Sequence, residues 1–176
     1  MRHSPAEWQA LRAEHSRAVG QFISTAKGVP QDSWDRPLAE GKWTPAEVTA
    51  HLSESYRILR SELATGLGMG LRLGRMRRWV FRHTILPRIL ASGRFPRGAR
   101  APRETRPLQI VSDISAAVEA LTDEAEAFAA ELNARAALGT VHLTHAYFGP
   151  MSATQAMRLV TVHTRHHARQ LETAVA

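Results

Sequence analysis

Residues 44–52 read Thr44-Pro45-Ala46-Glu47-Val48-Thr49-Ala50-His51-Leu52. A threonine followed by a proline and a glutamate marks a helix start. The threonine side chain can cap the first free N–H groups, the proline suits the first helical turn, and a glutamate three residues after the cap completes a capping box. The apolar stripe of this helix would run through Val48, Leu52, Leu59 and Leu63. His51 lies on the same stripe, so the segment predicts a helix that carries an imidazole toward the core.

Three further segments carry helix signals. Ser4-Pro5-Ala6-Glu7 repeats the same start for a first helix, and Ser112-Asp113 begins an alanine-rich third helix with acids on its polar face. Ser152, with Gln155 three residues on, caps a fourth helix. No segment shows the period-two alternation of a half-buried strand. The sequence therefore predicts an all-α fold.

A long connection separates the second and third predicted helices. The crossover, about residues 67–111, is long enough to cross the whole molecule, which permits these two helices to run parallel. Within it, Leu71–Leu90 is expected to be partly helical, and Ser92–Pro107 is expected to form a loop rich in glycine, proline and arginine. The connection 133–151 is expected to be a moderate loop. With 176 residues and 19.5 kDa, we expect residues 1–176 to form one domain.

Composition excludes several classes of protein. The chain has no cysteine, which rules out disulfides, thiolate zinc sites, iron–sulfur clusters and a cysteine nucleophile. The content of 44% hydrophobic and 22% charged residues argues against wholesale disorder. No stretch approaches the roughly 20 apolar residues of a membrane span, and Met1–Trp8 lacks the apolar run of a secretory signal. We therefore expect a cytoplasmic protein without a membrane span.

Positive charge is concentrated in the crossover. Between Arg72 and Arg106 there are eleven arginines and one acid, Glu104, which gives +10 in a chain of net charge +7. The cluster could bind an anion, form a solvated face, or contact the acidic third helix of a second copy in a homodimer. Nucleic-acid binding is less favoured, because no zinc knuckle, RNA-recognition motif or glycine-rich phosphate loop is present. The arginines of Leu71–Leu90 are scattered around the predicted helix, which argues against a membrane-surface role.

Two histidines of the last helix have the spacing of a metal site. His163 and His167 are four residues apart, so their rings lie on one helical face and could hold a single cation. His51 could supply a third nitrogen, and three imidazoles leave coordination positions open for water or substrate. The alternatives are that His51 is a hydrogen-bonded core residue and that the His163–His167 pair is accidental. His166 is rotated away from this face and is expected to be structural or exposed.

Other polar candidates have weaker signals. Gln170, three residues after His167, could support a ligand or a water molecule. Glu54, three residues after His51, is more simply read as facing solvent. Trp34 and Trp43 are more simply read as packing anchors than as groups that stack on a substrate. No acyl-transfer triad or carboxylate pair stands out, so no catalytic residue is assigned.

Three segments resemble one family. Lys42–Leu52 resembles the W-S/T-P-x-E-x-x-x-H-L segment of DinB/YfiT-like proteins, and His163–Leu171 resembles the H-x-x-H-H-x-x-Q segment near the carboxyl end of that family. Tyr147-Phe148-Gly149-Pro150 is similar to the aromatic-glycine segment that precedes the last helix. The resemblance implies a four-helix bundle in up-down-down-up order, with the crossover between helices 2 and 3. It also implies one divalent metal ion held by His51, His163 and His167.

The resemblance also suggests a function. The family includes thiol-cofactor S-transferases and a mycothiol-dependent maleylpyruvate isomerase. We therefore expect a metal-dependent enzyme that activates a low-molecular-weight thiol or water, for transfer to or hydrolysis of a small electrophilic substrate. Zn²⁺ is the favoured metal, with Ni²⁺, Mn²⁺ and Fe²⁺ as alternatives, since imidazole ligation does not discriminate well among them. The contrasting hypothesis is a noncatalytic metal- or ligand-binding bundle, or a dimeric structural protein.

Overall fold

The computed structural model describes residues 4–66, 69–70, 73–96, 105–107, 109–139, 141 and 143–175. Within these residues the chain forms five α-helices, a short 3₁₀ turn and one two-stranded antiparallel sheet. The elements in chain order are α1 (Pro5–Lys27), η1 (Gln31–Ser33), α2 (Pro45–Thr65), α3 (Arg75–Ser92), α4 (Ile114–Leu138), β1 (Leu143–His145), β2 (Gly149–Met151) and α5 (Ala153–Val175). The fold is thus mostly helical, as the sequence predicts.

All four predicted helix starts are confirmed. Ser4 and Glu7 form a reciprocal capping box on α1, and Thr44 and Glu47 form another on α2. The Asp113 carboxylate accepts the Ala116 N–H at 2.7 Å at the start of α4. Before α5, the Ser152 hydroxyl accepts the Gln155 N–H at 3.2 Å, and the Gln155 amide oxygen accepts the Ser152 N–H at 3.1 Å. Local capping chemistry, legible in the sequence, therefore fixes where the long helices begin.

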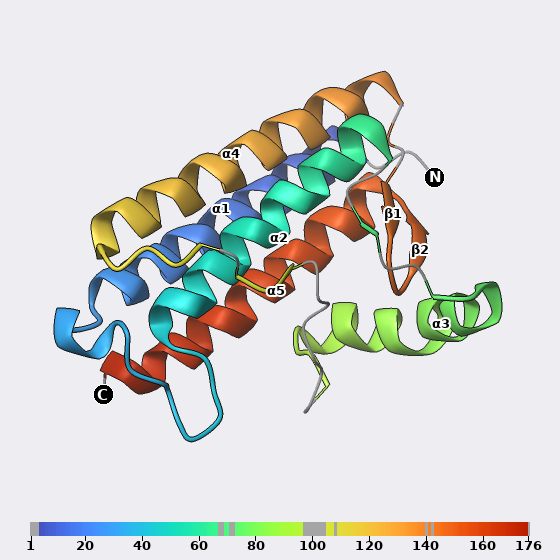
Figure 1. Ribbon diagram of the computed structural model, residues 1–176. Coiled ribbons are helices and arrows are strands. Elements are labelled where there is room, and N and C mark those ends of the chain that lie inside the picture. Colours follow the sequence, from blue (N-terminus) through green and yellow to red (C-terminus); the bar gives the residue numbers. More distant parts are fainter. Residues whose placement is uncertain are drawn as a thin grey trace.

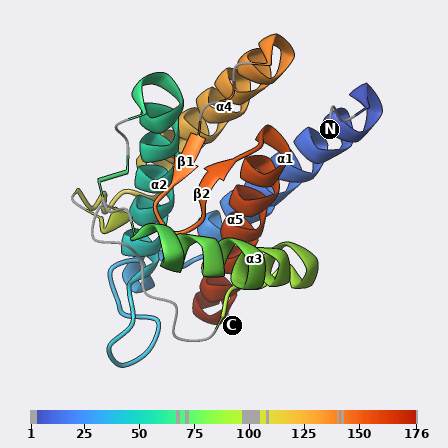
Figure 2. The ribbon, with the colours of Figure 1, turned by 90° about the vertical axis from the view of Figure 1, so that its right-hand side faces the viewer.

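The long helices α1, α2, α4 and α5 lie side by side, and α3 lies outside this group, against α5 (Figures 1 and 2). Helix α1 packs along α5, and α2 packs along α4. Large apolar and aromatic side chains fill the space between these helices. Those that are fully buried include Phe22, Leu52, Tyr56, Leu121, Phe128, Met157 and Leu171.

Helix α3 occupies the first half of the crossover, where partial helix was expected. It packs against α5 and β2 through the buried side chains of Leu86 and Ile89. Arg82 donates from its guanidinium to the backbone carbonyls of Phe148 and Pro150, which ties α3 to the hairpin. Residues 71–72 and 97–104 of the expected helix and loop lie outside the described residues.

The connection after α4 differs from the expected loop. Helix α4 continues past Asn133 to Leu138 and ends at Gly139, whose φ of 68° is in the left-handed region. The strands β1 and β2 then pair, with Leu143 opposite Met151. Strands of three residues are too short to show a period-two pattern, so periodicity does not reveal them. The buried Glu62 carboxylate accepts the Thr144 N–H at 3.2 Å and anchors the hairpin to α2.

A chain of buried hydrogen bonds joins three of the bundle helices. Nε2 of His15 lies 2.9 Å from the Tyr56 hydroxyl, which lies 2.7 Å from the Thr164 hydroxyl. The Thr164 hydroxyl also donates to the Val160 carbonyl at 3.0 Å. Because the chain ends on a carbonyl, each member donates to the next, and His15 is the first donor. Burial lowers the pKa of His15 to about 4, which keeps the ring neutral at physiological pH.

This histidine makes stability depend on pH. Between pH 6.5 and pH 4 the unfolded chain protonates His15 and the folded chain does not, so acidification favours unfolding. The shift corresponds to about 3 kcal/mol at the acidic end of that window. We expect His15→Gln to flatten the fall in unfolding free energy over this range by about that amount, measured by urea denaturation. The exposed-histidine control His83→Gln should follow the wild type. Parallel pH profiles for His15→Gln and the wild type would contradict the assignment.

Candidate metal centre

Three imidazoles converge between α2 and α5. His51 comes from α2, and His163 and His167 come from consecutive turns of α5. The Nε2 atom of His163 lies 3.2 Å from Nε2 of His51 and 3.0 Å from Nε2 of His167. One ligand atom from each of the three rings can be chosen so that all lie within 4.8 Å of one another. The structure thus brings together the three histidines that the sequence singled out.

The outer nitrogen of His51 is fixed by the crossover. Its Nδ1 donates to the backbone carbonyl of Thr105 at 2.5 Å, and the two residues are 54 positions apart in the chain. The Trp43 ring packs against the His51 ring with a centroid distance of 4.8 Å. A neutral imidazole that donates from Nδ1 has a bare lone pair on Nε2. His51 therefore presents an electron pair, not a proton, to the other two rings.

The outer nitrogen of His167 is fixed in the same way by Gln170. Nδ1 of His167 lies 2.7 Å from the Gln170 amide oxygen, which can only accept, so Nδ1 carries the proton. The amide nitrogen of Gln170 donates in turn to Nε2 of His166 at 3.3 Å. Gln170 thus takes the supporting position that its spacing suggested. His167, like His51, presents a bare Nε2 to the centre.

These tautomers leave the centre short of protons. The lone pairs of His51 and His167 both face His163, and the neutral His163 ring has at most one Nε2 proton to give. One lone pair is therefore unpaired among the three rings, which is unfavourable in a buried site. A cation that accepts all three lone pairs would remove this conflict. The two short Nε2 separations are also close to the roughly 3.3 Å between two ligands of one tetrahedral Zn²⁺, so the donor set fits a divalent metal.

Burial keeps all three rings neutral. Desolvation lowers the pKa of His163 and His167 well below the usual range, and the neighbouring imidazoles lower it further. Desolvation also lowers the pKa of His51, although its hydrogen bond to Thr105 opposes the shift. A neutral imidazole is the form that binds metal ions. The electrostatics of the site and its hydrogen bonds therefore favour the same ligating state.

A family comparison agrees with this geometry. The sequence model of one family, the DinB superfamily, matches residues 14–171, which is most of the chain. The chain belongs to the DinB superfamily. Neither a curated protein nor a solved structure matches it. The family match spans His51, His163 and His167, and the resemblance stated from their sequence motifs is confirmed.

The DinB-like centre is bordered by part of the crossover. The Phe95 ring contacts the rings of His163 and His166 at centroid distances of 5.5 and 5.6 Å. Thr105, from the other end of the same connection, supplies the acceptor for His51. Sequence reasoning placed neither residue at the histidine site. Thr105 acts through its backbone carbonyl, which leaves no residue-type signal, and Phe95 lies in a segment without helical periodicity.

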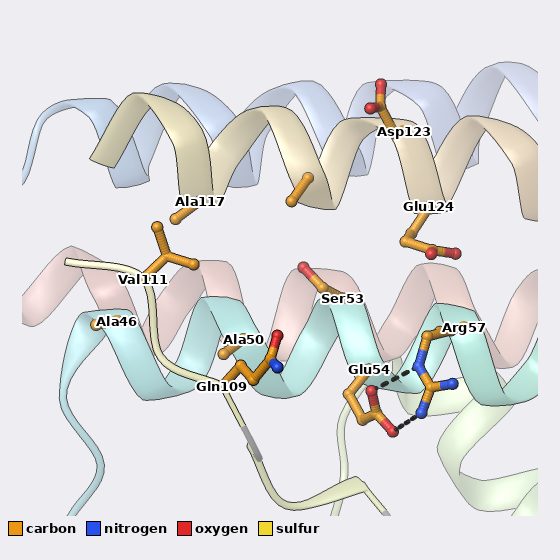
Figure 3. A pocket seen from close by; sticks show the side chains of 11 residues that line it. Ala46, Ala50, Ser53, Glu54, Arg57, Gln109, Val111, Ala117, Asp123 and Glu124 are labelled. Atoms are coloured by element: carbon orange, nitrogen blue, oxygen red, sulfur yellow. Dashed lines mark hydrogen bonds and ion pairs between the residues drawn. The ribbon is translucent and has the colours of Figure 1, made fainter. Parts of the chain in front are cut away.

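The remaining candidates take structural positions. Trp34 is buried and donates from Nε1 to the Val111 carbonyl at 3.0 Å, so it is a packing anchor as expected. Glu54 binds Arg57 at 2.5 Å and lines a groove of about 560 Å³ between α2 and α4 (Figure 3). The Glu124 carboxylate in this groove binds Arg60 at 2.6 Å. Three of the four charged residues that line the groove, Glu54, Arg57 and Glu124, are thus engaged in ion pairs.

The expectations about a membrane span and about the crossover arginines can be compared only with the part of the chain that the structure describes. No described helix is long and apolar enough to cross a membrane. Of the crossover arginines, Arg72, Arg97, Arg100 and Arg103 lie outside the described residues, as do His3 and His142.

The tautomers of the site can be tested directly. In chelator-treated protein, long-range ¹H–¹⁵N spectra should show His51 and His167 protonated on Nδ1, because each has a fixed acceptor there. Gln170→Leu removes the acceptor of His167 only, so His167 should lose its single tautomer while His51 keeps it. Gln9→Leu, at an exposed position of α1, is the control. A His167 signal that is unchanged in Gln170→Leu would contradict this account.

Proposed function

We propose that this DinB superfamily protein binds one divalent metal ion through His51, His163 and His167. The observation that carries the proposal is the convergence of three Nε2 atoms, two of which have their lone pairs fixed toward the centre by Thr105 and Gln170. Zn²⁺ is the favoured ion and Ni²⁺, Mn²⁺ and Fe²⁺ are alternatives, since imidazole ligation does not discriminate well among these ions.

The same proposal extends to the architecture. A four-helix bundle of α1, α2, α4 and α5 in up-down-down-up order is supported by the parallel course of α2 and α4 in Figure 1. We also treat residues 1–176 as one domain, with residues 67–111 as its crossover. The homodimer and the cytoplasmic location stay predictions.

We further propose that the centre serves an enzyme acting on a small electrophile. When bound, the metal would lower the pKa of a thiol or a water molecule and so supply a nucleophile near neutral pH. Three protein ligands leave open the position that such chemistry needs. Transfer of a low-molecular-weight thiol is the preferred reaction and hydrolysis is the second, because the family resemblance favours that order. No catalytic residue beyond the site histidines is assigned.

The chain's own residues supply orientation and exclusion of water. Thr105 and Gln170 hold the rings of His51 and His167, so little motion is needed when a ligand is exchanged. His51 and His167 are buried, while His163 is half-buried beside Phe95. Access from solvent is therefore expected past His163, between Phe95 and the rings of α5. A small electrophile entering there would meet an aromatic surface before it reaches the histidines.

Metal content tests the first step of this proposal. We expect untagged wild-type protein to contain one equivalent of metal, measured by elemental mass spectrometry, and His163→Ala to lose it because only two ligands remain. His166→Ala is the matched control, since this neighbouring ring is not a ligand and should leave the metal in place. Metal that is well below one equivalent in the wild type and unchanged in His163→Ala would end the proposal.

Turnover tests the second step. Metal-loaded wild-type protein, assayed with a panel of biological thiols and small electrophiles, should consume thiol and electrophile together, and His163→Ala should not. Product formation that depends on metal but consumes no thiol would instead identify the hydrolase. Stoichiometric metal without turnover of either kind would support the noncatalytic metal-binding bundle.

A further inference from the structure

The fully buried apolar side chains of α3 lie in its second half, whereas the large exposed ones lie in its first half. Leu86 and Ile89 are buried against α5 and the hairpin. Met76, Trp79 and Val80, in the first two turns, have 79, 63 and 40% of their surface exposed. Their spacing of three and four residues places them on one helical face. A soluble surface seldom gathers a tryptophan, a methionine and a valine in this way without a partner.

Exposed arginines border this apolar face. Arg75 lies one turn before Trp79, and Arg77 and Arg88 lie beyond Val80 on the opposite edge of the exposed surface. All three arginines are exposed, and α3 contains no acidic residue. Arg82, by contrast, is turned toward the hairpin carbonyls. The α3 arginines thus include Arg82, which is bound to the hairpin, and Arg75, Arg77 and Arg88, which are exposed.

We propose that α3 docks in the plane of an anionic membrane surface. The apolar face would enter the boundary between headgroups and acyl chains, and Arg75, Arg77 and Arg88 would pair with lipid phosphates. A helix with bulky apolar residues on one face and basic residues at its edges is the arrangement that binds such an interface. Tryptophan is enriched at this depth, because its ring is amphipathic. Charge complementarity is therefore the feature that selects the partner.

Two other occupants fit the surface less well. A twofold contact between α3 of two copies would place arginine-rich, acid-free helices against each other, and like charges oppose that pairing. A contact between α3 and the acidic α4 of another copy closes into a dimer only if α3 and α4 of one copy face the partner together. In Figure 1 these two helices lie on opposite sides of α2 and α5, which disfavours that arrangement. Nucleic acid would satisfy the arginines but would leave Met76 and Val80 against a charged backbone. The bilayer surface alone satisfies both parts of this face.

Vesicle binding of the full chain tests the proposal. We expect the protein to co-sediment with vesicles of equal parts phosphatidylcholine and phosphatidylglycerol, and to bind phosphatidylcholine alone much more weakly. Binding should fall as salt is raised, since the arginine contribution is screened. Tryptophan emission should shift to shorter wavelength on binding, and this shift should be absent in Trp79→Ser.

Matched variants assign the effect to α3. Arg75→Gln/Arg77→Gln/Arg88→Gln should weaken binding by about fivefold for each arginine, hence about a hundredfold in all. Arg12→Gln/Arg17→Gln/Arg158→Gln removes the same charge from exposed positions on α1 and α5 and should bind nearly as the wild type does. Met76→Ser/Trp79→Ser should lose binding while keeping the helical circular dichroism of the wild type. His163→Ala should bind vesicles normally, so the outcome is separate from that of the metal centre.

Several results would overturn the proposal. Equal binding to both kinds of vesicle, or to neither, would exclude an anionic membrane surface. Equal loss of binding in the two triple-arginine variants would show an effect of net charge rather than of α3. Failure to bind vesicles together with tight, salt-sensitive binding of an oligonucleotide would assign the face to nucleic acid. The protein could instead fail to bind vesicles and form a dimer that the variant Met76→Ser/Trp79→Ser dissociates. That result would assign the exposed face of α3 to a second copy of the chain.

Discussion

Two lone pairs from separate helices point at one histidine ring, and this constraint governs the centre of the molecule. His51 and His167 can present their Nε2 atoms in this way only if α2 and α5 keep a fixed register. The hydrogen bond between Tyr56 and Thr164 helps to fix it, because Tyr56 lies five residues after His51 and Thr164 directly follows His163. The buried chain that begins at His15 extends this link to α1. The polar network beside the site thus specifies one register between the helices, because any other register would leave its buried polar groups without partners. An apolar core alone discriminates less well between registers.

The second constraint comes from outside the bundle helices. The proton on Nδ1 of His51 is held by Thr105, in a connection that the family motifs do not include. Gln170 performs the same task for His167, but from within the α5 motif. The two histidines therefore have supports of different origin. Any change in the crossover near Thr105 acts on His51, whereas the support of His167 is carried by the helix itself.

The sequence was most informative where the chemistry is local. Capping residues such as Thr44 and Glu47 predicted the helix starts, because a cap depends on side chains within one turn. The spacing of His163 and His167 predicted a shared face for the same reason. That His51 would join them was a weaker inference from periodicity and needed the family resemblance as support. Thr105 could not be predicted, since a backbone carbonyl 54 residues away has no residue-type signal. The β1–β2 hairpin was missed because its strands are too short for periodicity to show.

The crossover is also where this protein can differ most from others with the same histidine motifs. The motifs fix which atoms could hold a metal ion, but they do not fix what approaches it. Phe95 stands against His163, the most exposed of the three rings, and Phe95 directly follows the segment that ends α3. The proposed entrance to the centre, beside Phe95, and the exposed residues of α3 are therefore parts of one connection. If that face rests on a bilayer, the entrance is held near the lipid surface, and an apolar electrophile that partitions into lipid would reach the centre more readily than a strongly hydrated one. Substrate choice in this protein would then be set by the crossover rather than by the metal ligands.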